Sequence, residues 1–217
     1  MKTPALDRDK HARSVAPVPN ARAEEKSASA LLAFAKRKGD PTWKVRTYPL
    51  VLVLDGRRFD ATFATDGYSM ALRVRGDASD LSCVDDPSDF LPVEPTFGAR
   101  DDDRPPAYWL AFRHLSDEPS RRIGLDAALL ARVDDVQQAL RVESRARLLE
   151  LAKDAQRRRD RKAAEVWEKA ASETSPRAEW RVSHAYDPVL WVVRVEPQNR
   201  IHVPTLYVGA IMPWSMP

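Results

Sequence analysis

Two Asp-Gly pairs set between apolar segments constrain the fold of this chain most strongly. Asp55-Gly56 and Asp66-Gly67 are hairpin turn signals, because these residue types tolerate positive φ. A continuous apolar segment, residues 48–54, precedes the first turn. Apolar residues then alternate with polar ones on both sides of the second turn, as in half-buried strands. The sequence therefore predicts a three-stranded antiparallel meander.

Helices are expected before and after this meander. Ser27 has the side chain of an N-cap, and the residues after it place apolar groups on one side of a helix. Neither Gly nor Pro occurs from residue 126 to residue 175, so nothing local breaks a helix that begins after Asp126. The expected elements are a helix at 28–38, the meander, a loop at 77–106, a strand at 107–114, a long helix from 126 to about 171, and strands at 180–186, 189–195 and 205–212.

This order predicts an α+β fold with antiparallel sheets backed by helices. A helix followed by three strands occurs twice, and one long helix is highly charged. Residues 1–26 are polar and contain three prolines, which predicts a flexible tail. Residues 27–217 form the α+β region, either as one domain or as two halves, 27–115 and 116–217, with a helical insertion at 141–171.

Composition excludes several protein classes. The longest apolar runs, residues 50–54 and 189–193, are far shorter than the roughly 20 residues of a membrane helix. Cys83 is the only cysteine, which excludes an intrachain disulfide. The first residues lack the apolar core of a secretory signal. We therefore expect a cytoplasmic protein without membrane contact.

The sequence lacks a recognisable catalytic constellation. Its seven glycines form no phosphate-binding loop, and its four histidines lie far apart. His184 fits a core or edge position on a strand, and the acidic surroundings of Cys83 disfavour a thiolate. The run Asp101-Asp102-Asp103 is typical of a solvated loop, and a hydrolase or nuclease that uses it is the least favoured alternative. We expect no enzyme activity, metal or cofactor.

Charge is distributed unevenly along the chain. Residues 77–103 contain nine acidic side chains and one basic side chain, whereas residues 141–171 contain ten basic and six acidic ones. The basic segment could lie across phosphates and bind DNA without reading its sequence. The alternative is a solvated helix with internal i,i+4 ion pairs: Glu143 with Arg147, Asp154 with Arg158 and Glu165 with Lys169. The candidate DNA-binding residues are Arg145, Arg147, Arg157, Arg158, Arg161 and Lys162.

Two short segments resemble a known family. Residues 63–72, Phe-Ala-Thr-Asp-Gly-Tyr-Ser-Met-Ala-Leu, resemble the Ala-Thr-Asp-Gly-His-Arg-Leu-Ala segment of bacterial DNA sliding clamps, the β subunit of the replicative polymerase. Residues 206–214, Leu-Tyr-Val-Gly-Ala-Ile-Met-Pro-Trp, resemble the closing strand of that family, which ends in Tyr-Val-x-Met-Pro-Met. Tyr68 and Ser69 stand where the family usually has His and Arg.

The resemblance implies an apolar pocket for short peptide motifs of replication and repair proteins. Methionine and aromatic side chains suit such an adaptable groove. Without the resemblance, the favoured interpretation is that Met70 and Ile211 simply point into the core of a sheet. The residues that the resemblance assigns to the pocket are Thr65, Gly67, Tyr68 and Met70 on one wall and Ile211, Met212, Pro213 and Trp214 on the other.

The expected function is that of a sliding-clamp-like processivity or scaffold protein on double-stranded DNA. Family clamps have three domains in each chain, and 217 residues are too few for three. A ring would therefore require a homo-oligomer with closed symmetry. The alternative is a non-enzymatic interaction or inhibitor protein that does not encircle DNA.

Overall fold

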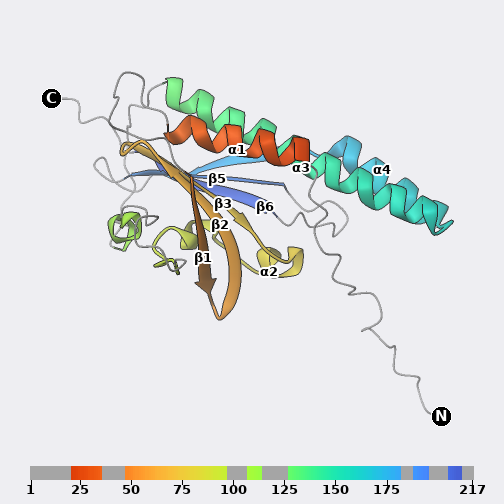
Figure 1. The fold of residues 1–217 in the computed structure, drawn as a ribbon, viewed down its shortest axis with the longest axis horizontal. Coiled ribbons are helices and arrows are strands. Elements are labelled where there is room, and N and C mark those ends of the chain that lie inside the picture. Colours follow the sequence, from red (N-terminus) through yellow and green to blue (C-terminus); the bar gives the residue numbers. More distant parts are fainter. Residues whose placement is uncertain are drawn as a thin grey trace, which may run out of the picture.

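The computed structural model describes residues 21–35, 47–96, 107–113, 127–181, 188–195 and 205–211. Within these ranges the fold is α+β, as predicted: helices pack on a single antiparallel sheet of six strands (Figure 1). The strands are β1 (Tyr48–Leu54), β2 (Arg57–Thr65), β3 (Ser69–Arg75), β4 (Pro176–Arg181), β5 (Val189–Val195) and β6 (Thr205–Ile211). The helices are α1 (Ala21–Ala35), α2 (Ala78–Ser82), α3 (Ala127–Arg157) and α4 (Arg161–Glu173), with short 3-10 helices η1 (Pro87–Phe90) and η3 (Tyr108–Phe112).

The sheet joins the first and last strands of the chain. Its order is β1-β2-β3-β6-β5-β4, and every neighbouring pair is antiparallel. The central pair, β3 and β6, runs from Ser69 opposite Ile211 to Arg75 opposite Thr205. Strands from the two expected halves of the chain therefore form one continuous sheet.

Both predicted Asp-Gly turns are confirmed. Asp55 and Gly56 have φ angles of 50° and 74°, the left-handed values of a tight hairpin between β1 and β2. Gly67 has a φ of 86° at the turn between β2 and β3. Phe59 and Ala61 on β2 alternate with exposed or half-buried neighbours, as predicted. Ala64, next to Phe63, is buried as well, because its side chain packs in the core on the other face of the sheet.

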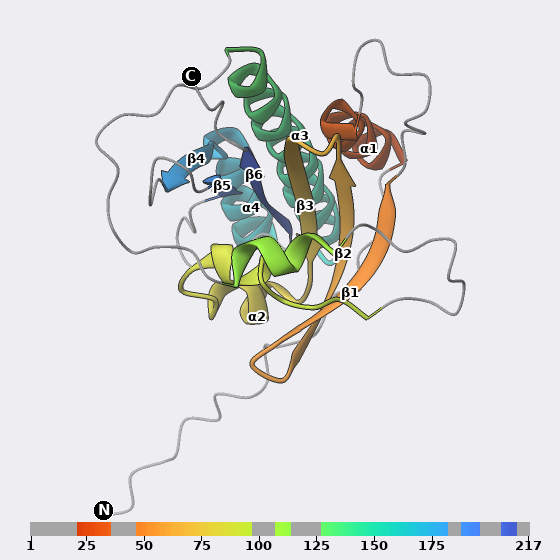
Figure 2. The same cartoon turned by 90° about the vertical axis from the view of Figure 1, so that its left-hand side faces the viewer.

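One face of the sheet is covered by α1 and α3, which lie side by side (Figures 1 and 2). The ring of Phe34 on α1 stacks on Trp191 of β5, with centroids 5.2 Å apart. On β6, Gly209 pairs with Trp191 of β5 on one side and with Ala71 of β3 on the other. These two small residues leave space for the indole of Trp191. An aromatic pair in a bed of small residues therefore anchors α1 to the sheet.

The opposite face is covered by α2, η1 and η3 (Figure 2). Phe63 on β2 stacks on Tyr108 of η3 at 4.3 Å, and Phe59 meets Phe90 of η1 edge-on at 5.0 Å. Because both faces are covered, β3 and β6 are buried almost throughout. The expected loop at 77–106 thus contributes α2, η1 and core side chains, and its Thr96 pairs with Val51 of β1.

Three further expected elements differ in the structure. The strand expected at 107–114 is η3, because Tyr108, Trp109 and Phe112 reach the core together from one short helical turn. The first helix begins at Ala21, so the tail expected at 1–26 overlaps it, and Ser27 is a buried helix residue instead of an N-cap. The strand expected at 180–186 is β4, which begins at Pro176; residues 182–187 lie outside the described part of the chain.

Candidate functional site

The long helix expected after residue 126 is divided into the helical hairpin of α3 and α4. At the end of α3, the N–H of Asp160 donates to the carbonyl of Ala155 at 2.9 Å, and the N–H of Arg159 donates to that of Gln156 at 2.9 Å. These two bonds define a Schellman motif, with Arg159 in the left-handed conformation at φ 62°. The Asp160 carboxylate then accepts from the N–H of Ala163 and caps α4.

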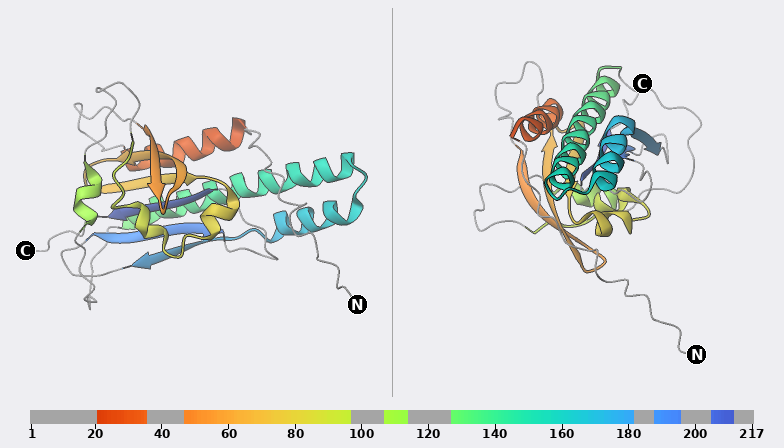
Figure 3. Two further views of the ribbon diagram at one scale, coloured as in Figure 1. Left: turned by 90° about the horizontal axis from the view of Figure 1, so that it is seen from below. Right: turned by 90° about the vertical axis from the view of Figure 1, so that its right-hand side faces the viewer.

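The bend between the helices carries a dense group of cations, here called the cationic tip: Arg157, Arg158, Arg159, Arg161 and Lys162. Every residue from 156 to 162 is exposed. Arg157 pairs with Asp154 at 3.0 Å. Within the described part of the chain, the other four side chains form neither an ion pair nor a hydrogen bond. Figure 3 shows the hairpin extending past the end of the sheet, so these cations project away from the core.

The predicted DNA-binding residues fall at two places. Arg157, Arg158, Arg161 and Lys162 belong to the cationic tip, whereas Arg145 and Arg147 lie at least ten residues earlier on α3. Arg145 is exposed and Arg147 is half-buried. At 1.5 Å per residue, Arg145 lies about 18 Å from Arg157 along the helix. The structure therefore brings together four of the six predicted residues.

The expected i,i+4 ion pairs of this region have other partners. Asp154 pairs with Arg157, three residues away, instead of Arg158. Glu143, expected to pair with Arg147, turns inward and accepts a hydrogen bond from Arg73 of β3 at 2.8 Å. Lys169 pairs with Glu173 at 3.8 Å. Internal pairing thus leaves most of the cationic tip unneutralised.

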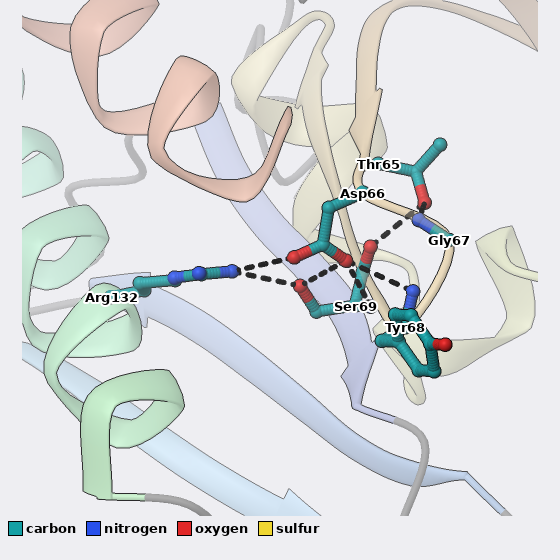
Figure 4. A network of polar contacts seen from close by, with 6 residues as sticks. All are labelled: Thr65, Asp66, Gly67, Tyr68, Ser69 and Arg132. Atoms are coloured by element: carbon teal, nitrogen blue, oxygen red, sulfur yellow. Dashed lines mark hydrogen bonds and ion pairs between the residues drawn. The ribbon is translucent and has the colours of Figure 1, made fainter. Parts of the chain in front are cut away.

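The second candidate site lies at the turn between β2 and β3, where the resemblance places a peptide pocket (Figure 4). The carboxylate of Asp66, only 6% exposed, accepts from the N–H groups of Tyr68 and Ser69 at 2.9 and 2.7 Å. Arg132 of α3 donates to its other oxygen at 2.8 Å. The Thr65 hydroxyl donates to the carbonyl of Ser69 and accepts from Gly67 N–H. Hydrogen bonds therefore brace the turn internally and tie it to α3.

The proposed walls of the pocket meet this turn from two sides of the sheet. Tyr68 is 50% exposed at the turn. Met70 is buried on the face under η3, whereas Ile211 at the end of β6 is buried on the face under α1 and α3. Strand pairing brings these residues to one end of the sheet, but Met70 and Ile211 do not face each other across a groove. Met212, Pro213 and Trp214 lie outside the described residues.

A buried polar cluster under α3 had no signal in the sequence. Glu143 accepts from Arg73 of β3 and from the Thr205 hydroxyl of β6 at 2.8 and 2.7 Å, and its second oxygen accepts from Ser27 of α1 at 2.8 Å. Side-chain exposure is 6% for Arg73 and 16% for Glu143. Four elements meet at this carboxylate, so it stabilises their packing.

The acidic segment after β3 is structured by its own carboxylates. Asp86 caps η1, and although burial alone would raise its pKa, hydrogen bonds from Ser88 and the charge of Arg181 bring it below the ordinary value. Burial raises the pKa of Asp89, and the neighbouring charge of Asp86 adds to the effect. Hydrogen bonds from Ser79 lower the pKa of Asp77, the N-cap of α2.

Across the described ranges, no group of three or more His, Cys, Asp or Glu side chains is placed to hold a metal ion. None of the described helices is both long and apolar enough to cross a membrane. Comparison with protein-family models, curated proteins and solved structures finds no match.

Proposed function

We propose that this chain is a non-enzymatic, clamp-related scaffold protein that binds double-stranded DNA without reading its sequence. The observation that carries the proposal is the cationic tip, where four exposed side chains have no partner among the described residues. The phosphates of DNA would supply the negative charge that these four cations lack among the described residues. Binding of this kind releases counterions, so its strength falls steeply as salt rises.

The order of the elements supports a clamp-related architecture. The sequence α1-β1-β2-β3 parallels α4-β4-β5-β6, and the two sets of strands meet at the pair of β3 and β6. In a ring built from such units, α1 and α3 would face the DNA, and the sheet with α2, η1 and η3 on its other face would point outward. A 217-residue chain would close that ring only with further copies of itself.

The partner-binding part of the proposal rests on the turn at Asp66. Peptide grooves need a rigid wall with an exposed anchor, since an ordered site loses less entropy when it binds. The hydrogen bonds of Asp66 and Thr65 supply the rigidity, and Tyr68 supplies the exposed aromatic group. Short peptide motifs of replication or repair proteins are the proposed ligands. Residues 212–214, which the resemblance also assigns to the pocket, lie outside the described residues.

The first experiment is absolute mass by light scattering behind a sizing column, over a series of protein concentrations. We expect a closed oligomer of defined size that stays on circular DNA and slides off the same DNA once it is linearised. A monomer that retains neither form would overturn the clamp proposal and favour the interaction-protein alternative.

The second experiment reverses charge at the tip. The variant Arg157→Glu, Arg158→Glu, Arg161→Glu should reduce affinity for a random duplex by at least tenfold, because three phosphate contacts become repulsive. The matched control replaces the same three residues with Lys, which keeps the charge. Equal binding by the Glu and Lys variants would remove these residues from the proposed site.

A further inference from the structure

Arg159 occupies a backbone position that favours glycine. Its φ of 62° lies in the left-handed region, where the Cβ of an L-residue approaches the following carbonyl. At this position of a Schellman motif, Gly is the usual residue and Asn is the common substitute. Within the described chain, only Asp55 is a second non-glycine residue with positive φ, and it lies in a tight hairpin that suits Asp. The arginine therefore carries a conformational cost that Gly would avoid.

Among the described residues, the Arg159 side chain makes no contact that would offset this cost. It is exposed, and none of the residues that the structure describes forms a hydrogen bond or ion pair with it. The bonds that end α3 are made by its backbone N–H and by that of Asp160, and any residue would supply them. A residue in an unfavourable backbone conformation, with no interaction in the fold that compensates for it, is a candidate functional position.

The surroundings of Arg159 indicate which ligand it meets. Residues 156–162 read Gln-Arg-Arg-Arg-Asp-Arg-Lys, so the tip presents charge and amide groups and no apolar side chain. Protein interfaces are centred on aromatic and apolar side chains that exclude water. Clustered guanidinium groups match phosphate oxygens, which they bind in pairs. The surface thus suits the backbone of a nucleic acid better than the surface of a protein.

We propose that Arg159 contacts the phosphate backbone of duplex DNA, and that the left-handed turn at the end of α3 places its guanidinium beside those of Arg158 and Arg161 and the ammonium of Lys162. This inference rests on the proposed DNA binding and adds a residue that the sequence alone did not single out. Because Gly suits the turn better than Arg, a Gly variant separates the effect of residue 159 on DNA binding from its effect on stability. Removal of the side chain weakens binding and does not lower stability.

The test measures binding of Arg159→Gly to a random 30-base-pair duplex by fluorescence anisotropy, between about 50 and 200 mM salt, together with thermal melting. The slope of log K against log salt is negative, and we expect it to become shallower by about 0.9, the contribution of one phosphate contact. We expect the melting temperature to equal or exceed that of the unchanged protein. Arg159→Asn, which tolerates the same backbone, should bind like the Gly variant, and Arg159→Lys should restore most of the slope.

The control is Arg58→Gly, which removes an exposed arginine from β2 and should leave the slope unchanged. An unchanged slope in Arg159→Gly, with salt-sensitive binding by the parent protein, would overturn the role of Arg159 alone. A parent protein that does not bind the duplex at 50 mM salt would overturn the proposed function and this inference together. A lowered melting temperature in Arg159→Gly would assign the arginine a structural role and also overturn the inference.

Discussion

Glu143 on α3 and Arg73 on β3 form an ion pair of 2.8 Å beneath the helix, and a second pair repeats the link with the charges exchanged. In that pair, Asp66 lies at the turn between β2 and β3 and Arg132 lies on α3, and their atoms are also 2.8 Å apart. Eleven residues, about three helical turns, separate Arg132 from Glu143 on α3. A shift of α3 along the sheet would separate Arg73 and Asp66 from their partners on the helix. The two ion pairs therefore fix the register of α3 on the sheet.

Glu143→Ala should reduce the free energy of unfolding by about 3–5 kcal/mol, because it leaves the guanidinium of Arg73 buried without its anion. The double variant Arg73→Met, Glu143→Leu removes both charges and should recover most of that loss. Urea denaturation of the parent, the single and the double variants measures the coupling. If the double variant is less stable than Glu143→Ala, the cluster stabilises the fold through more than this charge pair.

Asp66→Ala should cost about 3 kcal/mol, because it removes the ion pair with Arg132 and leaves the N–H groups of Tyr68 and Ser69 without their acceptor. Asp66→Asn keeps one carbonyl oxygen for those N–H groups, so we expect it to lose about 1 kcal/mol less. Chemical denaturation of the two variants separates the turn from the charge. Equal losses would assign the whole effect to Arg132.

Gly209→Ala should destabilise the sheet by about 3 kcal/mol. A Cβ at residue 209 would collide with the indole of Trp191 and with the carbonyl oxygen of Met70. The backbone atom cannot move without disturbing the pairing of β3 with β6, so Trp191→Phe should rescue the variant only in part. Thermal melting checks both variants. Native stability of Gly209→Ala would mean that β6 can shift away from β3.

The two carboxylates beside η1 should respond to pH in opposite ways. Asp86 has a lowered pKa in the folded protein, so its stabilising effect is full above the ordinary value of 3.8 and disappears as pH falls through the lowered value. Asp89 has a raised pKa, so its ionised form opposes folding at neutral pH, and this penalty disappears as pH falls toward 3.8.

At pH 7, therefore, Asp86→Asn should be less stable than the parent protein and Asp89→Asn more stable. Each difference should stay below about 1 kcal/mol, because both groups are partly solvated. Denaturation at pH 7, 5 and 3 measures the trend. Stabilisation by Asp86→Asn at pH 7 would contradict the assigned direction.

Local signals in the sequence were enough to predict much of the sheet. Asp55-Gly56 and Asp66-Gly67 form their turns because of their own backbone preferences. On β2, the alternation of apolar and polar residues shows which side chains point into the core. The end of α3 was different, since no Gly or Pro marks it. The break arises at Arg159 and Asp160, where backbone and capping bonds close the hairpin once α4 packs back on α3.

The sites depended still more on contacts between distant residues. Ser27 has the chemistry of a cap, yet its hydroxyl donates to Glu143, 116 positions later in the chain. Met70 and Ile211 both belong to the predicted pocket, but the pleat of paired strands sends them to opposite faces. The sequence was enough to predict that residues 157–162 carry a concentration of positive charge. Only the structure shows that these residues lie at the bend between two helices.

The double use of Asp160, which ends one helix and begins the next, turns the hairpin into a fixed-length spacer. From Glu143, where α3 is tied to the sheet, to Arg157 the helix rises about 21 Å. The three residues between the helices, 158–160, all donate backbone hydrogen bonds to α3, so the bend contains no segment that could lengthen or shorten the hairpin. The reach of the cations is therefore set by counting helical residues, and deleting one full turn from both arms would shorten that reach by about 5 Å without changing the charge presented.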